Sequence, residues 1–331
     1  MQKENLKGIY ERVSKRVVGR ERETRNILAA LAAGRHILLE GPPGTSKSTL
    51  LQVIAEESGG TPFIMVEGNA DLTPSKLLGY FDPAQAVAQG YKPENFVEGP
   101  LLEAMKKGGI LYIDEFNRIP PDALNVLMRA IEEGEIVVPR VGLIKSNNGF
   151  RLVSAQNPYD DVGTSKVSMG IYDRLCKLKM SYQSKEEEEQ IVQLRTGSKD
   201  EKLVELAVDL SRRTRNYPEI RQGASVRGAM HFVEIFQQLA TLEKENIHDS
   251  EIYLSLVLDA AYMALGSKLW LVETSKKTPE EVIKQIVLEA LGLISENEET
   301  RTRQHTMTET SNESREELGR FFRGSNRQEI S

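Results

Sequence analysis

The chain has 331 residues, enough for one large or two ordinary domains. Its 28% charged and 39% hydrophobic residues are typical of a globular protein, and no apolar run is long enough to predict a membrane span. A formal net charge of −6 gives no overall attraction to nucleic acid, so no nucleic-acid partner is expected. The polar start of the chain and its single cysteine, Cys176, indicate a cytoplasmic protein without internal disulfides.

The first predicted elements are a helical region, a strand and a phosphate-binding loop. Residues 3–33 have the apolar spacing of helices, and the apolar run 36–40 predicts a strand. A Gly/Pro-rich loop follows, and then a helix begins with a lysine and a hydroxyl residue, the order that cradles nucleotide phosphates on backbone N–H groups. The expected binding residues are Gly41, Pro42, Pro43, Gly44, Thr45, Ser46, Lys47, Ser48 and Thr49.

Two residues of this loop carry specific expectations, and one departs from the usual pattern. Lys47 is expected to reach the β- and γ-phosphates of ATP, and Ser48 to offer its hydroxyl to Mg²⁺. Ser46 replaces the glycine that normally precedes the lysine. A small residue fits there if its backbone angles are helical, and the exchange leaves open a slower or tighter nucleotide cycle.

Further along, the apolar runs 62–66 and 109–113 predict two more strands, and the second ends in a pair of carboxylates. A phosphate loop needs a partner strand with an acidic end that faces the same metal ion. Asp114 is therefore the expected Mg²⁺ residue, and Glu115 the expected group that orients and polarises the attacking water. Neighbouring residues of a strand point to opposite faces, which lets the two carboxylates take different roles.

The next segment predicts a hairpin and then a fourth strand. Two short apolar runs flank Pro139 and Arg140, which indicates a hairpin over residues 134–150. The apolar run 151–155 ends at Asn157, at the end of a parallel strand where ligands bind in open sheets. Asn157 is expected to contact the γ-phosphate or the attacking water, although an Asn-Pro pair also forms turns.

A short strand near 175–180 is preceded by Arg174. Arginines in such stretches are more often surface salt-bridge partners. The preceding motifs, however, call for a cation that stabilises transferring charge, and such a cation donated in trans is worth ~10³–10⁵ in rate. Cys176 is expected to be buried for packing.

The remaining chain divides into a helical region and a polar tail. Five helices are predicted between residues 184 and 294, and the boundary before them falls near Ser184. The predicted organisation is thus an α/β core over 1–183, a parallel sheet of the P-loop NTPase type with helices on both faces, and an all-α lid over 184–294. Residues 295–331 are nearly bare of aliphatic side chains and predict a disordered tail.

With these motifs in view, the chain resembles the AAA+ ATPases, and within them the MoxR family, over roughly residues 10–295. The order of several strings carries the resemblance: Asp71-Leu72-Thr73-Pro74-Ser75-Lys76-Leu77-Leu78-Gly79, Phe96-Val97-Glu98-Gly99-Pro100-Leu101, Asp114-Glu115-Phe116-Asn117-Arg118-Ile119-Pro120-Pro121, Ala155-Gln156-Asn157-Pro158 and Gly223-Ala224-Ser225-Val226-Arg227. Residues near 70–98 and the hairpin near 134–150 look like the two features of the helix-2-insert clade.

The resemblance implies roles that the residues alone do not. Asn157 aligns with the first sensor, Arg174 with the arginine finger that reaches a neighbouring subunit, and Arg227 with the second sensor in the lid. It also implies a ring, a hexamer, which hydrolyses ATP with Mg²⁺. The partners it implies are a von Willebrand factor A domain protein and a client protein that undergoes chaperone-like remodelling, maturation or metal insertion.

Two other functions remain open from the sequence. A ring motor that acts on nucleic acid is disfavoured by the charge and by the absence of a recognisable nucleic-acid-binding module in the sequence. A nucleotide switch that does not hydrolyse ATP is suggested by Ser46 alone, and the set Asp114, Glu115, Asn157 and Arg174 favours hydrolysis.

Overall fold

The computed structural model describes residues 6–158, 169–243 and 249–295. It divides into two compact units, Met1–Ser184 and Lys185–Ser331, and each is described by itself. The tail expected over 295–331 lies outside the described residues from position 296 onward.

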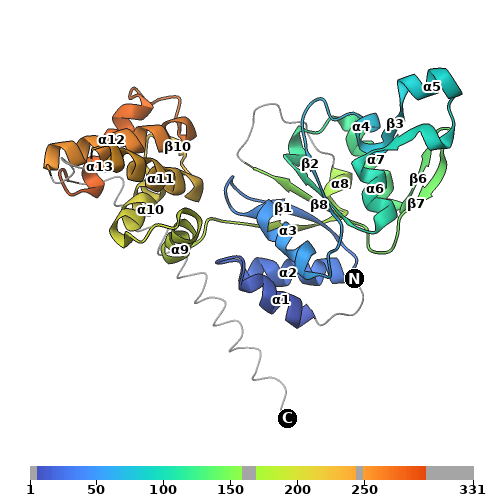
Figure 1. Cartoon of the computed structure of the whole chain (residues 1–331), viewed down its shortest axis with the longest axis horizontal. Coiled ribbons are helices and arrows are strands. Elements are labelled where there is room, and N and C mark those ends of the chain that lie inside the picture. Colours follow the sequence, from blue (N-terminus) through green and yellow to red (C-terminus); the bar gives the residue numbers. More distant parts are fainter. Residues whose placement is uncertain (1–5, 159–168, 244–248, 296–331) are drawn as a thin grey trace, which may run out of the picture. The chain divides into compact units, whose positions relative to one another are not determined.

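A five-stranded parallel sheet forms the centre of the first unit (Figure 1). Across the sheet, its strands are β2 (Phe63–Glu67), β5 (Ile110–Asp114), β8 (Arg151–Gln156), β1 (His36–Glu40) and β9 (Leu175–Lys179). The fold class predicted from the sequence is confirmed for this sheet. Strand β8 lies between β1 and β5. Because the strands are parallel, the carboxyl ends of these three strands lie next to one another at the same end of the sheet.

Helices cover both faces of this sheet because its strands are apolar on both sides. One face packs against helices α1 (Leu6–Ser14), α2 (Glu21–Ala32) and α3 (Lys47–Glu57). The other face packs against α4 (Pro74–Leu78), α6 (Pro100–Lys107), α7 (Pro121–Glu132) and the short α8 (Met169–Tyr172). Alternate residues of each strand serve the two cores. In β5, Leu111 and Ile113 face the second set of helices, whereas Ile110 and Tyr112 face the first.

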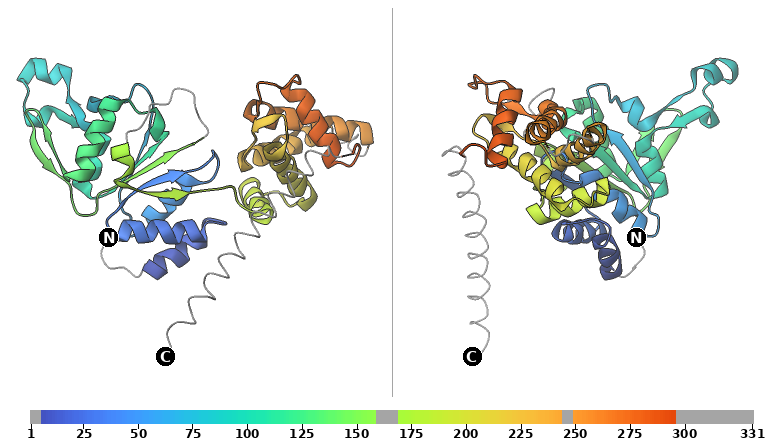
Figure 2. Two further views of the ribbon diagram at one scale, coloured as in Figure 1. Left: turned by 180° about the vertical axis from the view of Figure 1, so that it is seen from behind. Right: turned by 60° about the vertical axis from the view of Figure 1, so that its left-hand side comes forward.

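Two excursions project from the second face, and Figure 2 shows them at one end of the unit. The first excursion, the insert, is built from α4, β3 (Gly79–Phe81), α5 (Pro83–Gln89), the 3₁₀ turn η1 (Pro93–Asn95) and β4 (Phe96–Glu98). The second is the antiparallel hairpin of β6 (Glu135–Val138) and β7 (Gly142–Lys145). They touch where the Arg140 guanidinium lies 4.0 Å over the Tyr91 ring, a cation–π contact that joins hairpin to insert.

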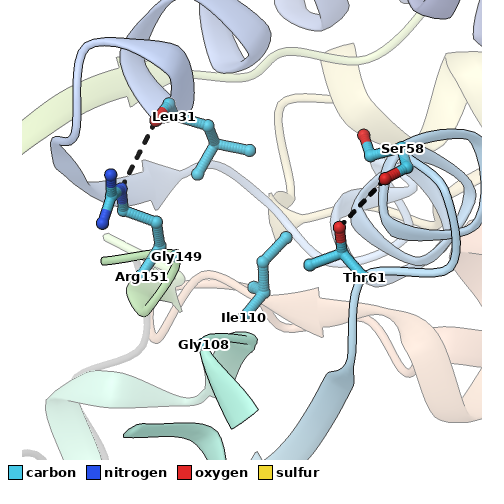
Figure 3. Close-up of a pocket in the computed structure, with 7 residues that line it drawn as sticks. All are labelled: Leu31, Ser58, Thr61, Gly108, Ile110, Gly149 and Arg151. Atoms are coloured by element: carbon cyan, nitrogen blue, oxygen red, sulfur yellow. Dashed lines mark hydrogen bonds between the residues drawn. The ribbon is translucent and has the colours of Figure 1, made fainter. Parts of the chain in front are cut away.

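A small cavity lies at the amino-terminal end of the sheet, where β5 and β8 begin (Figure 3). Its volume is about 20 Å³, and its lining consists of Leu31, Ser58, Thr61, Gly108, Ile110, Gly149 and Arg151. Arg151 Nε donates to Leu31 O at 3.3 Å, and Thr61 Oγ1 donates to Ser58 O at 3.2 Å. A cavity of this size holds about one water molecule, so it is no nucleotide site.

His36 begins β1 at this same end of the sheet and makes stability depend on pH. Burial, and then the positive charge of Arg151, lower the pKa of His36 to about 4. Its Nδ1 accepts a hydrogen bond from Leu152 N at 2.9 Å, which a protonated imidazole cannot do.

We therefore expect stability to be full above pH 6.5 and to fall as the pH drops toward 4, because the unfolded chain binds this proton more readily. Between pH 7 and 5 the loss should be about 2 kcal/mol. Denaturant unfolding of the native chain and of His36→Gln at both pH values tests this. The variant should lose less stability than the native chain, and an equal loss would assign the effect to other groups.

The second unit is a helical bundle around one core. Its helices are α9 (Lys185–Thr196), α10 (Glu201–Asn216), α11 (Val226–Leu242), α12 (Ser250–Leu265) and α13 (Pro279–Ala290), with a 3₁₀ turn η3 (Gly266–Lys268). Helix α13 begins with a capping box between Thr278 and Glu281. Across the described ranges, no helix has both the length and the apolar character needed to cross a bilayer.

The expectation that this unit contains helices only was wrong in one detail. Strands β10 (Ile220–Gln222) and β11 (Trp270–Leu271) form a short antiparallel pair. Segments of three and two residues are too short to show an alternating pattern in the sequence, and they pair only because the helical packing brings them together.

Candidate nucleotide site

The phosphate loop connects β1 to α3 at the carboxyl edge of the sheet. Gly41 must be glycine because a Cβ there would lie 2.2 Å from Met180 O. Gly41 N donates to Gln156 O at 3.2 Å, which ties the start of the loop to the end of β8. The Thr45 hydroxyl donates to Pro42 O at 2.9 Å and closes the loop. The loop is thus a compact turn at the N-terminus of a helix, a place that favours anions.

Lys47 lies over this turn. Its Nζ donates to Gly41 O at 2.8 Å and to Pro42 O at 3.0 Å, and the residue is 9% exposed. The loop therefore surrounds a positive charge with backbone groups at a helix N-terminus, and an anionic phosphate chain fits such a cradle. Ser48, one residue further along α3, brings a hydroxyl to the same turn.

Ser46 is the unusual residue of the loop. Its backbone is left-handed, with φ 63° and ψ 25°, whereas the sequence pattern suggested that a small residue would fit with helical angles. Left-handed angles cost a residue with a Cβ roughly 1–2 kcal/mol, and glycine adopts them freely. This explains why glycine is usual at the position before the lysine.

Ser46→Gly should therefore stabilise the protein modestly. The strain relieved exceeds the extra entropy of glycine in the unfolded chain by about 0.5–1 kcal/mol. Thermal unfolding measures the change, and Ser46→Ala is the matched control, since it removes the hydroxyl and keeps the Cβ. If both variants gain equally, the hydroxyl and not the backbone angle is the source.

The acidic pair lies at the end of β5. Asp114 is the last residue of the strand, and its Oδ1 accepts a hydrogen bond from Glu115 N at 3.0 Å. Glu115 then turns the chain with a left-handed φ of 49°. Tyr112 lies two residues before Asp114 in β5. Burial, and next the charge of Asp114, raise the pKa of its hydroxyl, which therefore stays protonated. The acidic turn is thus a constrained structure rather than a solvated loop.

Gly68 supports this turn, and sequence reasoning did not identify it. Its N–H donates to Asp114 O at 2.9 Å, and a Cβ at Gly68 would lie 2.5 Å from Glu115 O. The residue follows β2, the neighbour of β5 in the sheet. Only a known strand order could have connected it with the acidic pair.

Arg118 belongs to one of the strings that carry the resemblance, but the sequence predicted no role for it. Its Nε lies 3.4 Å from Glu115 Oε2, three residues away across the 3₁₀ turn η2 (Phe116–Arg118). The Glu115 carboxylate therefore faces a positive charge within its own chain.

Asn157 follows β8, the strand between β1 and β5. The end of β8 is fixed on one side, where Gln156 Nε2 donates to Glu40 Oε1 at 3.1 Å. This topology puts the residue after β8 between the phosphate loop and the acidic turn.

Arg174 lies elsewhere. It precedes β9, whose first residue pairs with His36 at the start of β1. The length of strand β1, about 15 Å, therefore separates Arg174 from the end of the sheet that carries the phosphate loop. Its exposed guanidinium forms an ion pair with Glu132 at the end of α7 and donates to Gly170 O. Cys176, two residues further, is exposed. The expected burial was wrong because β9 is an edge strand.

Arg227 belongs to the second unit. It is exposed in the first turn of α11, where the capping hydroxyl of Ser225 accepts from Arg227 N at 3.4 Å. A cation at this end opposes the helix dipole, so helix stability does not account for the arginine.

The parallel sheet with strand order β2-β5-β8-β1-β9 and a phosphate loop after β1 is a P-loop nucleotide-binding fold. Residues 36–175 match the AAA domain (dynein-related subfamily), so the chain carries an AAA-type ATPase domain, which implies ATP binding. A solved structure of a mutant RuvB from Thermotoga maritima shares the fold. Its TM-score is 0.50 at 21% identity, and the match covers 74% of this chain and 72% of that one.

Two bacterial relatives extend the likeness along the chain. An uncharacterized protein of Staphylococcus aureus (strain NCTC 8325 / PS 47) is 30% identical over 207 residues, which cover 61% of this chain and 78% of the relative. The uncharacterized protein YeaC of Bacillus subtilis (strain 168) is 28% identical over 275 residues, 74% of this chain and 82% of the relative. The chain belongs to the same family as the staphylococcal protein.

Proposed function

We propose that the protein is a MoxR-type AAA+ ATPase that hydrolyses ATP in a ring and uses the reaction to remodel a partner protein. One observation carries the proposal of hydrolysis. The phosphate loop with Lys47 and the acidic turn Asp114–Glu115 follow strands that end at the same sheet edge, with Asn157 after the strand between them. A site that only bound nucleotide would not need a water-orienting carboxylate.

Each residue then has a defined part in the reaction. Lys47 and the loop N–H groups hold the phosphates of ATP, and Ser48 and Asp114 are the residues that would hold Mg²⁺. When bound, Mg²⁺ neutralises charge on the phosphates. Glu115 orients the attacking water and accepts its proton, and Asn157 donates to the γ-phosphate or to that water.

The proposed ring rests on Arg174. Arg174 lies at the amino-terminal end of the sheet, and the phosphate loop of the same subunit lies at the carboxyl end. In a catalytic role, Arg174 would therefore act on the nucleotide of another subunit. An interface in which one subunit completes the next is heterologous, and a heterologous interface whose rotation closes gives a ring. We propose a hexamer on the resemblance to MoxR proteins.

The proposed work on a partner rests on the insert and the hairpin. They expose Tyr80, Val87, Tyr91, Val97, Val137 and Leu143, large apolar side chains of a kind that protein interfaces bury. The MoxR resemblance suggests a von Willebrand factor A domain protein as partner and chaperone-like activation, maturation or metal insertion as outcome.

Steady-state ATP turnover against protein concentration, with Mg²⁺, tests the proposal. Specific activity should rise steeply and then saturate as subunits complete each other's sites. A complete lack of turnover at every concentration, with ATP bound, would favour the nucleotide switch instead.

On the resemblance to MoxR proteins, Arg227 is proposed as the second sensor, which binds the nucleotide of its own subunit. Arg227→Ala should therefore weaken ATP binding about tenfold, the order expected for a lost hydrogen bond to a charged group. Equilibrium binding of a fluorescent ATP analogue measures this. Arg195→Ala, an exposed arginine of α9, should leave the affinity unchanged. An unaltered affinity in Arg227→Ala would remove Arg227 from the nucleotide site.

A further inference from the structure

Gly223 and Ala224, just before the start of α11, are held tightly against α10. Ala224 N donates to the buried Thr214 Oγ1 at 2.9 Å, and Ala224 O accepts from Arg215 Nε at 2.7 Å. Gly223 approaches α10 so closely that a Cβ would lie 2.6 Å from Thr214 O and from Arg215 N. These contacts fix the N–H and the C=O of Ala224, and they also fix the path of the chain at Gly223.

Arg215 is itself clamped. Its Nη1 lies 2.7 Å from Glu188 Oε1 of α9, and Glu188 is 1% exposed while the Arg215 side chain is 11% exposed. The guanidinium thus bonds to a buried carboxylate and, through Nε, to Ala224 O. A rigid planar guanidinium serves the two partners from separate nitrogens in a fixed geometry, which the flexible ammonium of a lysine does not reproduce.

The clamped backbone sets the start of α11. Ser225 caps the helix, and Gly228 N donates to Ser225 O at 2.8 Å. A Cβ at Gly228 would lie 2.8 Å from Leu265 Cδ2 and 3.0 Å from Ala224 Cβ, so the first turn packs closely against its surroundings. The backbone position of Arg227, the second residue of this helix, follows from the same contacts.

We propose that Arg215, held by Glu188, is a positioning residue that fixes the first turn of α11 and, with it, the backbone from which Arg227 binds ATP. The proposal rests on the role proposed above for Arg227. A buried ion pair is weak evidence for stability by itself, and fixing one geometry is a better-supported use of it. Here the geometry that it fixes is the start of the helix that carries Arg227.

The test is a double-mutant cycle on ATP affinity, measured in the full chain. Arg215→Lys should weaken ATP binding about tenfold, and it should have no further effect in the Arg227→Ala background. The matched control is Arg212→Lys, because Arg212 bonds the same carboxylate, Glu188 Oε2 at 3.2 Å, from a more exposed position. It should retain native affinity.

A second variant guards against a general loss of structure. Thr214→Val removes the acceptor of Ala224 N with a side chain of similar shape, and it should weaken ATP binding about threefold. If Arg215→Lys lowers ATP affinity equally in the native chain and in the Arg227→Ala background, Arg215 acts through overall stability, and the inference is overturned. Native affinity in Arg215→Lys beside a weakened Arg227→Ala would overturn it while leaving the role of Arg227 intact. Native affinity in Arg227→Ala would overturn both.

Discussion

Glu115→Gln should abolish ATP turnover and leave ATP binding nearly intact. The amide keeps the size of the side chain and loses the ability to accept a proton from water, so kcat should fall by about 10²–10⁴. Binding is expected to depend on the phosphate loop, where Lys47 contacts Gly41 O and Pro42 O. Steady-state turnover and equilibrium ATP affinity, measured on the same preparation, check both parts.

Two further variants make this result specific. Lys47→Ala should lose ATP binding itself, which separates holding the phosphates from activating water. Glu133→Gln, an exposed glutamate after α7, should turn over ATP like the native chain. Unchanged turnover in Glu115→Gln would remove Glu115 from its assigned role.

Arg174→Ala should lower kcat by ~10³–10⁵, because a guanidinium that neutralises transferring charge contributes on this scale. Substrate affinity should change little, since the subunit that binds ATP keeps its own loop. The effect should appear only at concentrations at which subunits assemble. Arg25→Ala on α2 is the control for removing an exposed arginine.

Mixing the two inactive variants distinguishes a role within the subunit from one across an interface. In a mixed ring, a Glu115→Gln subunit still carries Arg174 and can complete the intact site of an Arg174→Ala neighbour. Activity should therefore return on mixing. No recovery, in mixtures shown by sizing to assemble, would contradict a role across the interface.

Local sequence signals predicted much of this molecule. Strand 36–40 was located to the residue, and strands predicted at 62–66 and 109–113 lie at Phe63–Glu67 and Ile110–Asp114. Each is an apolar run bounded by glycine, proline or acidic residues, which fixes its type and nearly its limits. The phosphate loop and the acidic pair were found for the same reason, since each motif lies within a few residues of chain.

Features that depend on contacts between distant segments could not be predicted from the sequence. The support that Gly68 gives to Asp114 requires β2 to lie beside β5. The left-handed backbone of Ser46 follows from how the loop closes, and the exposure of Cys176 from the place of β9 at the sheet edge. Pattern rules describe one segment at a time, and they do not specify which segments meet.

The exposed thiol also gives the chain a built-in attachment point for a dye. Cys176 is the single cysteine of the 331 residues, so a maleimide fluorophore labels one position without any mutation. That position lies two residues from Arg174. If neighbouring subunits meet there, dyes on adjacent copies should quench one another or exchange energy when ATP is added. The native sequence therefore carries its own optical reporter of assembly, readable at nanomolar concentrations where sizing columns fail.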